Sequence, residues 1–93
     1  MNKEYTEIIY RKAFDRFGKV NQITVAIEEL SELQKELCKV LRGNMNIENV
    51  VEEIADVEIM IEQLRIMFNA DRDIDKVKAQ KIDRLKCRML EEG

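Results

Sequence analysis

The chain contains no proline, and in its interior only Gly18 and Gly43 interrupt residues that favour helices. Because proline and glycine are the residues that most often end helices, long uninterrupted helices are expected. Apolar residues recur at intervals of three and four, which is the spacing of one helical face, and turn signals between them are lacking. The sequence therefore predicts an all-α fold.

The boundaries of the expected helices follow from this spacing and from residues that commonly begin or end a helix. The helices cover roughly residues 3–17, 21–41, 47–68 and 71–90. The residues expected at their ends are Gly18, Asn21, Gly43, Asn46 and either Asp71 or Asp73. A short loop around Gly43 would make the second and third helices antiparallel neighbours.

The length and composition suit one small helical domain. Ninety-three residues allow a single domain, residues 1–93, which we expect to be a four-helix antiparallel bundle-like domain. Charged residues make up 38% of the chain and hydrophobic residues 45%, a mix typical of amphipathic helices and not of disorder. Because so short a chain buries only a modest fraction of its surface, we expect a homo-oligomer, either a dimer or a tetramer.

The charge and the cysteines exclude several classes of partner. The net charge of −3 gives no broad electrostatic reason to bind nucleic acid or an anionic membrane. No apolar run resembles a signal peptide or approaches the ~20 residues of a membrane span, so we expect a cytoplasmic location. The chain has no histidine, and Cys38 and Cys87 lie far apart, which nearly excludes a Cys/His zinc site. We expect two buried or half-buried thiols in a reduced compartment.

The second and third expected helices resemble each other when they are aligned with an offset of 24 residues. Any two amphipathic helices align partly through their period, but here the acidic residues coincide as well as the apolar ones. The coinciding acids are Glu28 with Glu52, Glu29 with Glu53, and Glu32 with Asp56. We interpret the two helices as a pseudo-repeated helical hairpin.

Helical geometry places some of these acids beside the apolar stripe of their helix. At about 100° per residue, Glu29 falls about 80° from the centre of the stripe and Glu32 about 140° from it. Glu53 and Asp56 take nearly the same places on the third helix, so the four side chains are expected to border the core and converge. Four carboxylates repel one another unless a cation lies between them, and all-oxygen ligands suit Mg²⁺ or Mn²⁺.

The competing interpretation is that these acids are only solvated, since glutamate favours helices and most Glu-rich helices carry such faces. The fourth expected helix bears on this choice, because Lys81 lies near the middle of its apolar stripe and Arg84 lies on one flank. A lysine in this position commonly extends to water, but both cations also suit contact with phosphates. A metal ion together with Lys81 and Arg84 would allow an acidic site to accept a triphosphate.

These elements resemble those of the MazG-like nucleoside triphosphate pyrophosphohydrolases, which are all-α enzymes related to the dimeric dUTPases. The matching motifs are Glu28-Glu29-x-x-Glu32, Glu52-Glu53-x-x-Asp56 and Lys81-x-x-Arg84. The resemblance covers roughly residues 22–84. One departure lies at Ala79, where the larger MazG proteins often carry an asparagine.

The resemblance implies a Mg²⁺-dependent enzyme that cleaves a nucleoside triphosphate between its α- and β-phosphates and releases a nucleoside monophosphate and pyrophosphate. The implied roles are Glu29, Glu32, Glu53 and Asp56 as metal ligands, Glu28 as the catalytic residue that positions or deprotonates water, and Lys81 and Arg84 as phosphate contacts. Two alternatives stay open. One is a non-catalytic helical oligomeric adaptor with solvated acidic faces, and the other is a protein that senses nucleotides without cleaving them.

Overall fold

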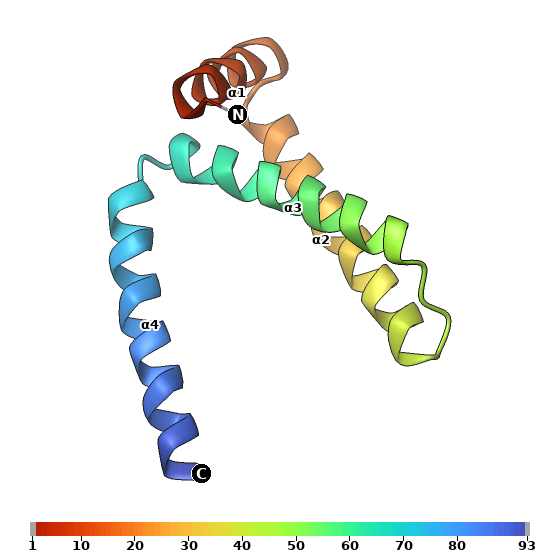
Figure 1. The fold of residues 1–93 in the computed structure, drawn as a ribbon. Coiled ribbons are helices and arrows are strands. Elements are labelled where there is room, and N and C mark those ends of the chain that lie inside the picture. Colours follow the sequence, from red (N-terminus) through yellow and green to blue (C-terminus); the bar gives the residue numbers. More distant parts are fainter. Residues whose placement is uncertain (1, 93) are drawn as a thin grey trace.

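The computed structural model describes residues 2–92, and the side chains of residues 2–91, as four α-helices joined by short connections (Figure 1). The helices are α1 (Lys3–Phe17), α2 (Lys19–Leu41), α3 (Ile47–Met67) and α4 (Asp71–Glu92). Because residues 2–92 contain no strand, the all-α prediction is confirmed. Within the same range, no helix is both long enough and apolar enough to cross a bilayer.

The residues that end the helices were largely predictable. Gly18 ends α1 with a φ of 86°, and its amide donates to the carbonyl of Phe14 at 2.9 Å. Asn46 caps α3, because its side-chain oxygen accepts a hydrogen bond from the amide of Asn49 at 3.2 Å. The prediction that Asn21 caps α2 is wrong, since α2 begins at Lys19 directly after Gly18. The left-handed backbone of Gly18 lets a single residue end one helix and begin the next.

The centre of the fold is the hairpin of α2 and α3, which pack against each other along their length (Figure 1). The connecting loop contains Gly43, whose φ of 78° favours glycine. By contrast, α1 contacts mainly α2, and α4 contacts the end of α3 before it runs away from the hairpin. The antiparallel hairpin was predicted, but the four helices do not close into a compact bundle within one chain.

The chain exposes far more surface than a compact protein of its size. Its accessible surface is 7767 Å², whereas a compact monomer of 11.0 kDa exposes about 5,600 Å². Its radius of gyration is 16.3 Å, against about 12 Å for a compact domain of 93 residues. Among the described residues, the only buried hydrophobic side chains are Tyr10, Ala26 and Met60. The hydrophobic core of a single chain is therefore very small.

Two predictions about burial are wrong for the single chain. The apolar stripe of α2 was expected to form the core, yet Leu30 is 46% exposed and Leu41 87% exposed. Both thiols were expected to be at least half-buried, yet Cys38 and Cys87 are exposed. The common reason is that α2 turns a different face toward α3, and that α4 has little to pack against. The buried face of α2 instead carries Gln22, Ala26 and Glu36.

Polar contacts link the helices where apolar ones are few. The Tyr10 hydroxyl on α1 donates a hydrogen bond to a carboxylate oxygen of Glu62 on α3. Burial, followed by the hydrogen bond and the charge of Glu62, raises the pKa of Tyr10 to about 12. The phenol therefore stays protonated and able to donate across the physiological pH range.

A buried pair of amides joins α2 to α3. The Gln22 side-chain nitrogen donates to the Gln63 side-chain oxygen at 2.7 Å, and the Gln63 nitrogen lies 3.7 Å from the sulfur of Met60. Both glutamines are buried. Polar groups in this environment are stable only when they are paired, so the two amides fix which residues of α2 and α3 face each other.

Replacing Gln22 with leucine should destabilise the protein, because the buried oxygen of Gln63 loses its donor. We expect the free energy of unfolding to fall by about 1–3 kcal/mol. The double variant with leucine at Gln22 and Gln63 should recover most of this loss, since an apolar pair leaves no unsatisfied group. Urea unfolding at one fixed protein concentration measures both variants. Equal losses in the single and double variants would contradict a coupled pair.

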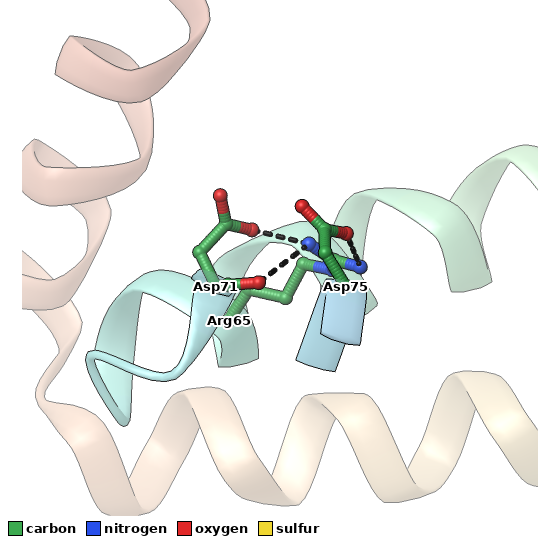
Figure 2. A network of polar contacts seen from close by, with 3 residues as sticks. All are labelled: Arg65, Asp71 and Asp75. Atoms are coloured by element: carbon green, nitrogen blue, oxygen red, sulfur yellow. Dashed lines mark hydrogen bonds and ion pairs between the residues drawn. The ribbon is translucent and has the colours of Figure 1, made fainter. Parts of the chain in front are cut away.

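The start of α4 is held by Arg65 on α3 (Figure 2). The Arg65 guanidinium forms an ion pair with the Asp71 carboxylate and donates to an oxygen of Asp75 at 2.8 Å. It also donates to the Asp71 backbone carbonyl at 3.4 Å. The Arg65 side chain is only 15% exposed, and its hydrogen bond and charge lower the pKa of Asp75. These three residues, the Arg65 clamp, fix the direction in which α4 leaves α3.

Replacing Arg65 with methionine should loosen the first turns of α4 without unfolding α2 and α3. The substitution keeps the apolar stem and removes both ion pairs, so the backbone amides of residues 71–78 should exchange with solvent faster. Hydrogen exchange followed by mass spectrometry makes the measurement, with the exposed Arg72→Met as the matched control. Unchanged exchange in residues 71–78 would show that the Arg65 clamp does not hold α4.

Candidate metal centre

The hairpin places acidic side chains inside the contact between α2 and α3. On α2, Glu29 lies seven residues after Gln22 and three after Ala26, so all three share the face turned toward α3. On α3, Glu53 and Asp56 precede the buried Met60 by seven and four residues. Glu29, Glu53 and Asp56 are all half-buried. The sequence predicted Glu29 at the border of the core, but the structure places it within the face that contacts α3.

Three of the four predicted metal ligands come together. One carboxylate oxygen from each of Glu29, Glu53 and Asp56 lies within 4.8 Å of the others. Oxygens bound to one Mg²⁺ lie about 2.1 Å from the ion and therefore at most about 4.2 Å apart. Oxygens within 4.8 Å of one another are close to this spacing, so the three residues could hold one divalent cation. We call these three residues the acidic triad.

The acidic triad contains buried oxygen atoms that lack a hydrogen-bond donor. Glu29 and Glu53 each have one carboxylate oxygen, Oε2, that is buried and has no partner. An unsatisfied buried carboxylate oxygen is costly, because water no longer solvates its charge. A cation between the carboxylates would remove this cost, as would protonation.

The pKa values of Glu29 and Glu53 are raised because their carboxylates are buried close to other acids. The pKa of Glu29 is raised by burial, then by the close Asp56 carboxylate and by the charges of Glu53 and Glu32. The pKa of Glu53 is raised by burial and then by the charges of Asp56 and Glu32. Carboxylates that repel one another in this way attract a divalent cation, which reverses the sign of the local field.

Two other predicted site residues, Glu32 and Glu28, are not among the three that come together. Glu32 lies outside the acidic triad and pairs with Lys35 on its own helix at 3.8 Å, although its charge acts on Glu29 and Glu53. Its side chain is 50% exposed, so it has room to turn. Glu28 is exposed at the outer side of α2. The fourth-ligand role of Glu32 and the catalytic role of Glu28 stay predictions.

Glu36 is a feature of the site region that the sequence did not indicate. Its side chain is only 9% exposed, one oxygen accepts a hydrogen bond from Lys39 at 3.2 Å, and Oε2 is buried without a partner. It lies seven residues after Glu29, on the same face of α2. The repeat gave no signal for it, because the residue at the corresponding position of α3 is Met60.

The two predicted phosphate contacts are not near the acidic triad within one chain. Lys81 and Arg84 are exposed on the part of α4 that runs away from the hairpin (Figure 1). Surface depressions occur in the described residues at the start of α4, beside Asn69 and Arg72, and near Arg11 on α1. Neither of these two depressions is lined by the acidic triad.

Comparison with known proteins identified no relative. No protein-family model, no curated protein and no solved structure matches the chain.

Proposed function

We propose that this chain is a Mg²⁺-dependent nucleoside triphosphate pyrophosphohydrolase, similar to the MazG-like enzymes. The reaction adds water across the bond between the α- and β-phosphates and gives a nucleoside monophosphate and pyrophosphate. The observation that supports it best is the acidic triad, in which Glu29, Glu53 and Asp56 bring oxygens within 4.8 Å of one another. This donor set suits Mg²⁺, with Mn²⁺ as a substitute, because it contains only hard oxygen ligands.

Each predicted site residue would have a separate role in such a reaction. The acidic triad holds the ion, and Glu32, one turn away on α2, is the candidate fourth ligand. A bound Mg²⁺ supplies charge neutralisation for the phosphates and lowers the pKa of a bound water. Glu28 is proposed to orient the attacking water and accept its proton. Lys81 and Arg84 lie away from the acidic triad within one chain, so their proposed contact with phosphate oxygens requires α4 of another copy of the chain.

We also propose that the working unit is a homo-oligomer. The chain exposes about 2,200 Å² more surface than a compact monomer of its mass, as estimated from the size scaling of folded proteins. A standard protein interface buries about 800 Å² on each partner, and obligate ones bury more. Light scattering coupled to size-exclusion chromatography tests this directly. A mass of 11.0 kDa at micromolar concentration would contradict it.

The enzymatic proposal is tested by incubating the purified protein with standard and damaged nucleoside triphosphates. Each substrate is supplied with Mg²⁺ or Mn²⁺, and pyrophosphate and monophosphate are measured together. The two products should appear in equal amounts and only when a divalent cation is present. Release of inorganic phosphate with a nucleoside diphosphate would indicate cleavage at a different bond, and no product from any substrate would overturn the proposal.

A non-catalytic oligomeric adaptor is the second candidate, and the large exposed apolar surface favours it. In that function the acids would be only solvated. Isothermal titration calorimetry separates the candidates, because an adaptor has no reason to bind Mg²⁺ and a nucleotide together. Tight binding of both to a protein that yields no product would instead support a nucleotide sensor.

A further inference from the structure

Beside the acidic triad, α2 carries a buried carboxylate that the proposed metal centre does not use. The side chain of Glu36 is only 9% exposed, and its Oε2 is buried without a hydrogen-bond partner. Glu36 is not among the residues whose oxygens gather within 4.8 Å, so a cation held by the acidic triad does not explain its burial. A carboxylate is rarely buried to this extent unless it is paired. Its partner is Lys39, whose Nζ donates to Oε1 at 3.2 Å.

The Glu36–Lys39 pair lies next to the acidic triad, on the side of the loop that joins α2 to α3. Glu36 follows Glu29 on the same face of α2, about 10 Å further along the helix axis. Its charge reaches the acidic triad, since it contributes to the raised pKa of Glu53. Side chains of a helix tilt toward its N-terminus, so Lys39 extends from the next turn back toward Glu36 and the acidic triad.

This pair differs from an ordinary ion pair on a helix surface. The comparable pair on α2, Lys35 with Glu32, spans 3.8 Å between side chains that are 63% and 50% exposed. Such a pair holds neither partner firmly, because both side chains move freely in water. Glu36 is buried and cannot follow a moving lysine, so it holds the Lys39 ammonium in one place. The ammonium has three donors and uses one for Glu36, and at 36% exposure the side chain leaves the others within reach of a ligand.

We infer that Lys39 binds a terminal phosphate of a polyphosphate ligand whose other phosphates bind the cation at the acidic triad, and that Glu36 positions Lys39 for this contact. The inference rests on the proposed pyrophosphohydrolase and adds a substrate-binding residue to it. One divalent cation neutralises only part of the charge of a triphosphate, and a lysine ammonium suits the remaining phosphate oxygens as a point charge. Within one chain Lys39 lies on the hairpin itself, whereas Lys81 and Arg84 lie on α4, away from the acidic triad.

Binding of inorganic tripolyphosphate in the presence of Mg²⁺ tests the inference, because this probe has no base and the measurement needs no turnover. Lys39→Met should raise the dissociation constant by about 10-fold or more, since a charged hydrogen bond is lost, and Lys39→Arg should keep it close to the wild-type value. Glu36→Gln should raise it by a smaller factor, because the amide still accepts a hydrogen bond but no longer attracts the ammonium. Isothermal titration calorimetry gives the constants, and circular dichroism checks the helix content.

A double variant covers the case in which Lys39→Met fails to fold because Glu36 is left buried and unpaired. Glutamine at Glu36 together with methionine at Lys39 removes both charges, leaves the net charge unchanged, and should weaken tripolyphosphate binding as much as Lys39→Met does. The matched control is Glu7→Gln with Arg11→Met, which removes an exposed ion pair of 3.0 Å from α1. The control should bind tripolyphosphate as tightly as the wild type.

Binding of Mn²⁺ alone, followed by electron paramagnetic resonance, separates phosphate binding from metal binding. Every variant of Glu36 and Lys39 should bind Mn²⁺ as the wild type does, because neither residue is a ligand of the ion. Equal tripolyphosphate binding in the wild type and the double variant would overturn the inference and leave the proposed hydrolase standing. Weaker Mn²⁺ binding in Glu36→Gln would make Glu36 a metal ligand and also overturn the inference. A wild type that binds Mn²⁺ but no tripolyphosphate would overturn the inference and the proposed function together.

Discussion

Replacing Glu53 with glutamine is expected to reduce pyrophosphate release by at least about 100-fold, because the acidic triad loses one of its three charged ligands. The amide keeps the volume of the side chain but is a weaker ligand for a hard cation. Glu53 is the most informative position, since it is half-buried and its Oε2 lacks a hydrogen-bond donor.

The matched control for this substitution is Glu52→Gln, one residue earlier on an exposed part of α3. It removes the same charge from the same helix and should leave the rate close to that of the wild type. Rates at saturating and limiting substrate separate a loss of metal from a loss of substrate binding. Wild-type activity in Glu53→Gln would remove Glu53 from the metal centre, and an equal loss in Glu52→Gln would indicate a general charge effect.

The second large effect concerns stability without metal. The pKa values of Glu29 and Glu53 are raised in the folded protein, so the folded state holds protons that the unfolded state has already released. The stability that these groups contribute is therefore complete below the ordinary glutamate pKa of about 4.3 and is lost as the pH rises through their raised values. Asp75 acts in the opposite direction, because its pKa is lowered and its contribution is lost as the pH falls.

A divalent cation should reverse this loss at neutral pH. Mg²⁺ at about 100 times its dissociation constant should add about 2.7 kcal/mol to the stability, which raises the melting temperature of a domain this small by about 10–20 °C. Thermal unfolding at one fixed protein concentration, with and without Mg²⁺ and at several pH values, measures both effects. The increase should shrink toward pH 4.5, where protons compete with the ion for the carboxylates.

The control for the metal effect is the double variant with glutamine at Glu29 and Glu53. Without metal it should be more stable than the wild type at pH 7, because two repelling carboxylates are gone. It should gain little from Mg²⁺, and its stability should change less with pH between about 4 and 7. An equal rise in melting temperature in the wild type and the double variant would place the cation elsewhere on the protein.

The helices themselves could be predicted because their signals are local. Three predictions depend on neighbouring residues alone: long helices in a chain without proline, the end of α1 at Gly18, and the cap at Asn46. The structure confirms all three. The prediction that Asn21 caps α2 was wrong for a similarly local reason. Gly18 ends α1 and directly precedes α2, so no linker remains in which a second residue could act as the cap.

The orientation of the helices could not be predicted from the apolar spacing alone. Each of the two central helices has both a mixed face and an apolar face, and the sequence does not state which of them meets the neighbouring helix. The structure joins the mixed faces, through Ala26, Met60 and the amides of Gln22 and Gln63, and leaves Leu30 exposed. This choice moved Glu29 from the edge of the expected core into the helix contact.

The candidate site was predictable to the extent that it follows the repeat. The 24-residue offset pairs Glu29 with Glu53, and the structure brings these two together with Asp56. Glu36 breaks the repeat and could not be recognised. The distance from Lys81 to the acids depends on the direction of α4, which the Arg65 clamp sets through contacts ten and six residues apart in sequence.

The two connections that flank α2 differ in length, and this difference has an evolutionary consequence. One residue, Gly18, separates α1 from α2, whereas residues 42–46 separate α2 from α3. An insertion at Gly18 would rotate α1 by a large angle and detach Tyr10 from Glu62, but an insertion in residues 42–46 would only lengthen an exposed loop. Related chains should therefore vary in length at the tip of the hairpin and keep an invariant spacing between the first two helices.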